Sequence, residues 1–154
     1  MSSIGEEIKR TFKQGSTLIK LIYINLGVFI LIGLIKVMGF LFGFSGIADV
    51  FVRFFAVPAD LGTLLTHPWT IFTYMFLHEG LWHILFNLLW LYVFGRIFLM
   101  YLNEKRLLSV YLVGGLAGAA LYILAFNVFP VFQPQVPASV ALGASASVMA
   151  IVIA

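Results

Sequence analysis

Two groups of polar side chains could do chemistry in this otherwise apolar sequence. His83 and Asn87 are four residues apart, so at helical pitch they share one face. Ser145 follows Gly143 in Gly-Ala-Ser-Ala-Ser, where small neighbours leave a hydroxyl open to approach. If this stretch opens a helix, its unpaired N–H groups and dipole favour the oxyanion that forms when a serine attacks a carbonyl. One interpretation of the pattern is therefore a serine nucleophile, with His83 and Asn87 as hydrogen-bond donors.

Both groups also have a structural interpretation that involves no chemistry. A histidine or asparagine in a membrane bundle commonly makes a helix–helix hydrogen bond. A serine among small residues can bond back to a carbonyl one turn earlier on a packing surface. Polar groups inside a membrane are nevertheless functional candidates by default. The residues by themselves leave both interpretations open.

The composition indicates where such groups would act. Of 154 residues, 62% are hydrophobic and 10% are charged, and the mean hydropathy is +1.09, which excludes a soluble globular domain. There is no cysteine, so disulfides and thiolate chemistry are excluded. The net charge is +3, but lysine and arginine flank apolar runs and therefore indicate topology. We expect a lipid bilayer around the chain and no nucleic-acid partner.

Apolar runs predict the helices that must position these side chains. Residues 21–42, 81–102 and 107–129 are each long enough to span a bilayer, which takes about 20 residues. A fourth run starts near residue 142 and reaches Ala154, so we expect the chain to end inside a fourth transmembrane helix. Gly114 and Gly118 form a G-x-x-x-G pair, which predicts close helix packing.

The remaining segments predict a cytoplasmic tail and a structured loop. Residues 1–20 are polar and predict a cytoplasmic N-terminal segment with an interfacial helix, ahead of a transmembrane domain over 21–154. In the long connection over 43–80, Asp60 can cap a helix over 61–66 and Pro68 can open another over 70–77. Such amphipathic helices lie in the headgroup layer. Gly43-Phe44-Ser45-Gly46 predicts a turn.

The distribution of basic residues predicts the orientation. Lysine and arginine gather before the first run and between the second and third runs, so the N-terminus is predicted to be cytoplasmic in a multi-pass protein of the cell membrane. The second and fourth helices then both start at the opposite side. This predicts that His83, Asn87 and Gly143 lie at similar depth.

The order of these parts resembles the rhomboid family of intramembrane serine proteases. In that family a long membrane-embedded loop precedes helix two, a histidine and an asparagine four residues later open that helix, and a G-x-S motif opens helix four. The residues that stand here in that order, within 21–154, are Trp69, His78, His83, Asn87, Gly143 and Ser145. The resemblance implies an all-α polytopic bundle of the rhomboid type, with a membrane-embedded first loop and with helices five and six missing.

The resemblance also implies a role for each matching residue. Ser145 would be the nucleophile, and His83 and Asn87 would donate to the oxyanion together with the Ser145 backbone N–H. It implies structural roles near the site for His78, Trp69 and Gly143. The function implied is a hydrolase, a serine endopeptidase that cleaves transmembrane segments of membrane-protein substrates by acyl transfer, without a cofactor.

The sequence departs from the family pattern at several positions. Ala146 replaces the last glycine of the common G-x-S-G, and Thr70 stands where many rhomboids have arginine after Trp69. A literal G-x-S-G occurs around Ser45, but it opens no spanning segment, so we favour Ser145. The family's general base is a histidine of helix six, and no such histidine is present. We therefore expect these 154 residues to be inactive by themselves and the parent protein to be active.

Other functions remain compatible with the sequence. A non-catalytic rhomboid-like protein that binds membrane clients is the main alternative, and a small channel or transporter fragment is a third. We expect no metal site, because His78 and His83 are five residues apart, which predicts different helical faces. The sequence does not indicate an oligomeric state.

Overall fold

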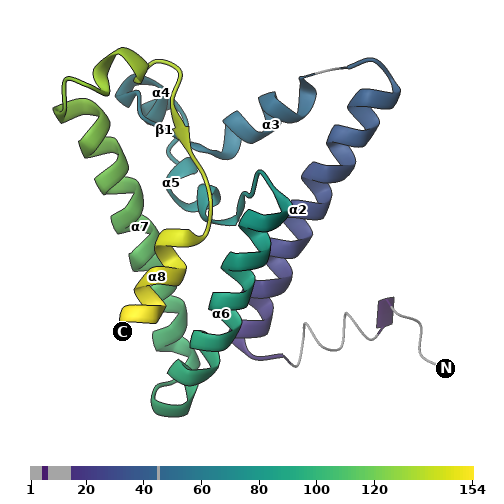
Figure 1. Cartoon of the computed structure of the whole chain (residues 1–154), viewed down its shortest axis with the longest axis vertical. Coiled ribbons are helices and arrows are strands. Elements are labelled where there is room, and N and C mark those ends of the chain that lie inside the picture. Colours follow the sequence, from purple (N-terminus) through teal and green to yellow (C-terminus); the bar gives the residue numbers. More distant parts are fainter. Residues whose placement is uncertain (1–4, 7–14, 45) are drawn as a thin grey trace.

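Three long helices dominate the computed structural model, which describes residues 5–6, 15–44 and 46–154 (Figure 1). α2 (Thr17–Leu41), α6 (Leu81–Tyr101) and α7 (Glu104–Val128) are each long and apolar enough to cross a membrane. The three predicted spans are confirmed, and the chain is an all-α polytopic membrane protein. The interfacial helix predicted within residues 1–20 falls mostly outside the described residues.

Polar caps move two helix starts away from the predicted positions. α2 begins four residues earlier than predicted, because the Ser16 hydroxyl accepts a hydrogen bond from the Ile19 N–H at 3.4 Å. α7 begins three residues earlier, because the Asn103 side chain accepts from the Arg106 N–H at 3.0 Å. The predictions placed these starts where the apolar runs begin. A capping side chain allows the helix to start earlier, among the polar residues before such a run.

The connection between α2 and α6 folds into short helices at the end of the bundle opposite the α6–α7 turn (Figure 1). They are α3 (Ile47–Phe55), α4 (Leu61–Thr66), α5 (Thr70–Thr73) and the 3-10 turn η1 (Tyr74–Phe76). The predicted cap of α4 is confirmed, since the Asp60 carboxylate accepts from the Thr63 N–H at 2.6 Å, a bond that lowers the Asp60 pKa. The helix predicted over 70–77 was partly wrong, because α5 ends at Thr73 and η1 follows it.

The turn predicted at residues 43–46 is confirmed at its described residues, and it joins α2 to α3. Gly43 and Gly46 have φ of +74° and +94°, in the left-handed region that favours glycine. Ser45 lies outside the described residues. The turn reverses the chain, so that α3 packs back against α2.

A short antiparallel strand pair joins this connection to the segment before the last helix. In β1 (Val57–Pro58) and β2 (Val140–Ala141), Val57 faces Ala141 and Pro58 faces Val140. The Ala59 N–H extends the pair by donating to the Ser139 carbonyl at 3.0 Å. The sequence predicted no strand here, because two residues show no periodicity.

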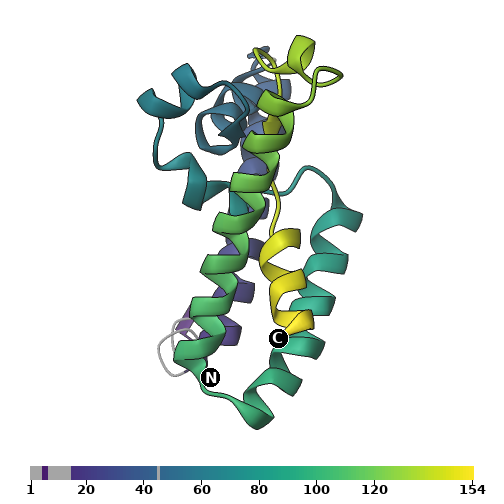
Figure 2. The same ribbon diagram turned by 90° about the vertical axis from the view of Figure 1, so that its left-hand side faces the viewer.

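The last helix, α8 (Ser145–Ile153), lies between α6 and α7 (Figure 2). Glycines of α7 allow this close approach. A Cβ added at Gly114 would collide with the Cβ of Ala150, and one added at Gly118 would collide with the Cβ of Ala146. The packing role predicted for the G-x-x-x-G pair is therefore confirmed.

A buried polar chain ties α2, α7 and η1 together in the core. The Asn25 amide donates to the Tyr111 hydroxyl at 3.2 Å, and that hydroxyl donates to the Met75 carbonyl at 3.3 Å. All three residues are fully buried. Because unpaired polar groups are costly in such surroundings, these bonds fix the end of the connection against two spanning helices.

Candidate active site

The segment that enters α8 is held against η1 through its backbone. The Gly143 N–H donates to the Tyr74 carbonyl at 2.9 Å, and Gly143 has a φ of +122°, which favours glycine. The predicted start of this helix near residue 142 was wrong by three residues, because β2 and the glycine turn come first. As a result, Ser145 is the first helical residue of α8.

The imidazole of His83 lies directly against this glycine turn. A Cβ added at Gly143 would be 2.8 Å from both Cε1 and Nε2 of His83. The ring therefore fills the space that a side chain at position 143 would need. The first turn of α6 and the entry to α8 meet at this point, which confirms the prediction that His83 and Gly143 lie at similar depth.

An open cavity of about 610 Å³ between α6 and α8 brings together Ser145, His83 and Asn87. Ser145 is exposed, His83 is half-buried and Asn87 is buried. The rest of the lining is largely apolar and consists of Trp82, Phe86, Trp90, Val148, Met149 and Val152. The cavity thus combines three polar side chains with walls suited to an apolar segment.

The hydrogen bonds of these side chains show which of their polar groups are already paired. The Asn87 amide donates to the His83 carbonyl, one turn earlier, at 3.0 Å. An amide carries two N–H donors, so Asn87 retains one for another acceptor. Among residues 5–6, 15–44 and 46–154, the Ser145 hydroxyl forms no hydrogen bond. A serine hydroxyl without a positioned base is a weak nucleophile.

His78 lies beside the cavity and is only 2% exposed. Burial lowers the pKa of His78 to about 4, and the charge of His83 acts in the same direction, so its ring is neutral near pH 7. The ring centroids of His78 and His83 are 5.0 Å apart. The inference that they occupy different faces of one helix was wrong, because His78 precedes α6 and lies in the connection.

Trp69 belongs to the loop and does not line the cavity. Its indole N–H donates to the Phe54 carbonyl at 2.9 Å, and its ring lies 5.0 Å from that of Phe54 and 4.9 Å from that of His67. The next residue, Thr70, donates to the His67 carbonyl at 2.7 Å, and this residue stands where many rhomboids have arginine. These contacts hold the start of α5 against the end of α3.

Three residues to which the sequence analysis assigned no role in the site support the strand pair and the turn. The Arg53 guanidinium donates to the Ala138 carbonyl at 3.1 Å, and the Asn127 amide donates to the Ala59 carbonyl at 2.9 Å. The Tyr74 hydroxyl donates to the Gly115 carbonyl of α7, while its own carbonyl receives the Gly143 N–H. In the sequence, Arg53 and Asn127 are isolated polar residues among apolar neighbours, and this was the signal that could have indicated them.

Comparisons with known proteins identify the family. No curated protein matches the chain. A family model, described as the Rhomboid domain, matches residues 65–154. The match covers more than half of the sequence and contains His83, Asn87 and Ser145, although α2, where the resemblance was expected to begin, lies outside it. The chain belongs to the rhomboid family.

Proposed function

We propose that the protein that carries this chain is an intramembrane serine endopeptidase in which Ser145 is the nucleophile. The contact between His83 and Gly143 is the observation that carries the proposal. It sets an imidazole, which can donate an N–H, beside the turn that leads into the helix headed by Ser145. Membership of the rhomboid family supports the same chemistry, because rhomboids are generally intramembrane serine proteases.

The proposed reaction is acyl transfer at a substrate carbonyl. The Ser145 hydroxyl attacks the carbonyl carbon and gives its proton to a general base, and the oxyanion accepts hydrogen bonds from His83, Asn87 and the Ser145 backbone N–H. Preorganised donors are most effective where water is excluded. The tetrahedral intermediate then breaks its C–N bond, the amine leaves with a proton, and water hydrolyses the acyl-enzyme.

None of the histidines of these 154 residues is a candidate general base for Ser145. The sequence has three histidines. His83 is assigned a donor role, and His67 packs against Phe54 and Trp69 in the loop. His78 does not line the cavity, and burial lowers its pKa to about 4, which makes it a weak base. The 154 residues by themselves are therefore predicted to be inactive, and the tests below use the whole protein that carries them.

The substrate we propose is a transmembrane segment of another membrane protein. The cavity walls are largely apolar, which suits side chains that come from lipid. A spanning helix keeps its carbonyls in internal hydrogen bonds, so the segment must unwind locally before Ser145 can reach one. We propose a cell-membrane location with a cytoplasmic N-terminus, which would place the cut near the outer face.

The direct test is cleavage of a reporter that carries one transmembrane segment between two soluble tags. The whole protein should cut the reporter, and Ser145→Ala should reduce cleavage to background. Ser109→Ala is a matched control, because Ser109 is an exposed serine of α7 bonded to the Lys105 carbonyl, and it should cut like the wild type. Equal cleavage by wild type and Ser145→Ala would overturn the proposal.

The alternative is a rhomboid-like protein that binds membrane clients without cutting them. The unbonded Ser145 hydroxyl within the described residues favours it. This alternative predicts that wild type and Ser145→Ala capture the reporter equally and that neither cuts it. The presence of two further donors beside Ser145 favours the protease, because binding an apolar client needs none of the three polar groups.

A further inference from the structure

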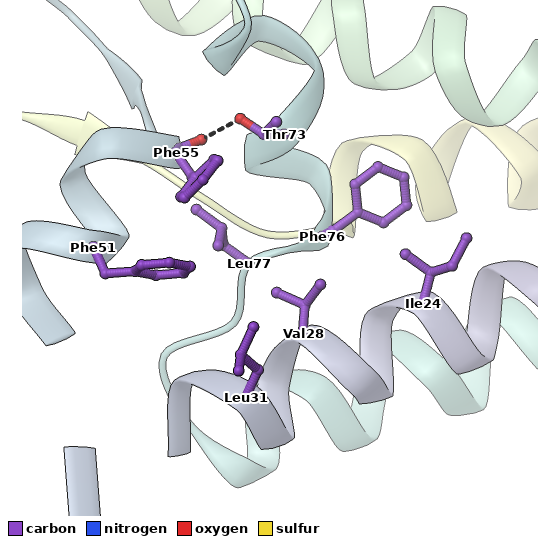
Figure 3. Close-up of a pocket in the computed structure, with 8 residues that line it drawn as sticks. All are labelled: Ile24, Val28, Leu31, Phe51, Phe55, Thr73, Phe76 and Leu77. Carbon is purple, nitrogen blue, oxygen red and sulfur yellow. Dashed lines mark hydrogen bonds between the residues drawn. The ribbon is translucent and has the colours of Figure 1, made fainter. Parts of the chain in front are cut away.

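The turn η1 is packed closely on one side and faces a cavity on the other. On the first side the Met75 side chain fills the space beside Gly115 of α7. The other side is an open apolar cavity of about 210 Å³, lined by Phe76 of η1 and by side chains of α2 and α3 (Figure 3). Because this cavity leaves η1 room to move, its position depends on what holds it against α7.

Tyr74, the first residue of η1, is bonded to α7 through its side chain. The Tyr74 hydroxyl donates to the Gly115 carbonyl, and the side chain is only 4% exposed. A Cβ added at Gly118 would be 3.0 Å from the hydroxyl oxygen, so the glycine leaves room for it. Burial raises the pKa of Tyr74, so the hydroxyl keeps its proton near pH 7 and remains a donor.

The same face of α7 also supports the first turn of α8. A Cβ added at Gly115 would be 2.7 Å from the Ser147 hydroxyl oxygen, and one added at Gly118 would collide with Ala146. Ala146 and Ser147 directly follow Ser145. Gly115 and Gly118 are three residues apart and share one helix face. The hydroxyl from η1 and the start of α8 therefore rest on the same part of α7.

The backbone of Tyr74 holds the turn that leads to Ser145. The Tyr74 carbonyl accepts from the Gly143 N–H at 2.9 Å and from the Leu77 N–H at 3.2 Å. Gly143 is two residues before Ser145. Tyr74 thus links α7 to the entry of α8 through two hydrogen bonds, one made by its side chain and one by its carbonyl.

We propose that Tyr74 is a positioning residue, which sets where the Ser145 hydroxyl lies when it attacks the substrate carbonyl. The inference rests on the proposed function, in which Ser145 is the nucleophile. Without the Tyr74 hydroxyl, η1 can shift toward the cavity and draw the Gly143 turn with it, while the rest of α8 stays packed on α7. Small displacements of a reacting group lower the rate steeply. Tyr74 does not line the candidate active-site cavity, so it acts only through the position of Ser145.

The rate at which a fluorophosphonate labels Ser145 tests this role. Tyr74→Phe removes the hydroxyl and keeps the ring. The whole protein is labelled in proteoliposomes, at a temperature at which circular dichroism shows each variant to be folded, so that lower stability alone leaves the rate constant unchanged. The rate constant should fall about fivefold to tenfold in Tyr74→Phe, as expected for one lost neutral hydrogen bond. Reporter cleavage should show the same fall in kcat with an unchanged KM.

Thr73→Val is the matched control for this experiment. It also removes one hydroxyl, from the residue directly before Tyr74, but that hydroxyl donates to the Phe55 carbonyl of α3 at 2.6 Å (Figure 3) and to the Trp69 carbonyl at 3.3 Å. These bonds do not involve α7 or Gly143, so Thr73→Val should lower Tm and still label at the wild-type rate.

The outcomes separate this inference from the proposed function. A wild type that is labelled at Ser145, together with an unchanged rate constant in Tyr74→Phe, would overturn the positioning role alone. An equal fall in Tyr74→Phe and Thr73→Val would overturn it too, because the loss would then follow from any weakened bond of the loop. A wild type that is not labelled at Ser145 would overturn the proposed function and this inference with it.

Discussion

The ring of His83 lies against Gly143, where a Cβ would be 2.8 Å from two of its atoms. The contact joins the first turn of α6 to the turn that precedes α8. Position 143 thus requires glycine for two reasons. Its φ is +122°, which other residues rarely adopt, and the His83 ring occupies the space that a side chain would need. The position of His83 and the path of the chain into Ser145 therefore depend on each other.

Gly143→Ala should reduce reporter cleavage by about 10²-fold, the effect expected when reacting groups shift by about 1 Å. The added methyl group must displace either the His83 ring or the turn. Initial cleavage rates in proteoliposomes measure the effect. Gly80→Ala is the control, because a Cβ at Gly80 meets nothing within 4 Å and its φ of −139° suits any residue. Similar losses in both variants would show that the contact has no role in activity.

Asn87→Ala should lower kcat by about 10² to 10³-fold, the usual result of removing one oxyanion donor. The KM should change little, because the donor acts on charge that forms only in the transition state. Steady-state kinetics with the reporter separate the two constants. A raised KM with an unchanged kcat would instead assign Asn87 to substrate binding.

Gly114→Ala should destabilise the protein by about 1–3 kcal/mol, the range for an overpacked contact. The new methyl group collides with Ala150 of α8. Gly33→Ala is the matched control, since Gly33 also lies inside a spanning helix but a Cβ there meets nothing within 4 Å. Thermal unfolding in detergent micelles compares the two. Equal shifts in Tm would contradict the packing role of Gly114.

The buried imidazole of His78 should make stability depend on pH. Its pKa is lowered from 6.5 to about 4 in the folded protein, so the unfolded chain binds more protons between these values. The free energy of unfolding should therefore be greatest above pH 6.5 and fall as the pH drops toward 4. Urea unfolding at several pH values measures this slope. In a His78→Phe variant, the free energy of unfolding should fall less steeply between pH 6.5 and pH 4. An unchanged slope would contradict a lowered pKa of His78 in the folded protein.

The parts of the fold that were predictable are those with a strong local cause. Three apolar runs gave three spanning helices, because a backbone in lipid must satisfy its own hydrogen bonds. The Asp60 cap depends on a side chain three residues from its donor, and it too was correct. α3 was missed because Asp49 and Arg53 gave it the appearance of a loop, although Ile47, Phe51 and Phe55 are spaced at helical pitch.

The geometry of the candidate site was harder to predict from the sequence, because it depends on contacts between distant segments. The chain order indicated that His83, Asn87 and Ser145 belong together. The strand pair and the bond from Gly143 to the Tyr74 carbonyl, which set where α8 begins, join residues 69 or more positions apart. No local pattern records such pairs. The closeness of His78 to His83 was missed for a different reason, because both were counted along one helix, whereas α6 begins at Leu81, after His78.

Labelling with a fluorophosphonate tests the assignment of Ser145 most directly, because this reagent forms a covalent adduct with an activated serine. The whole protein is treated in proteoliposomes, and peptide mass spectrometry locates the adduct. We predict an adduct on Ser145, none on the fully buried Ser147, and loss of both labelling and reporter cleavage in Ser145→Ala. An adduct on another serine, or reporter cleavage that persists in Ser145→Ala, would contradict the proposal that Ser145 is the nucleophile.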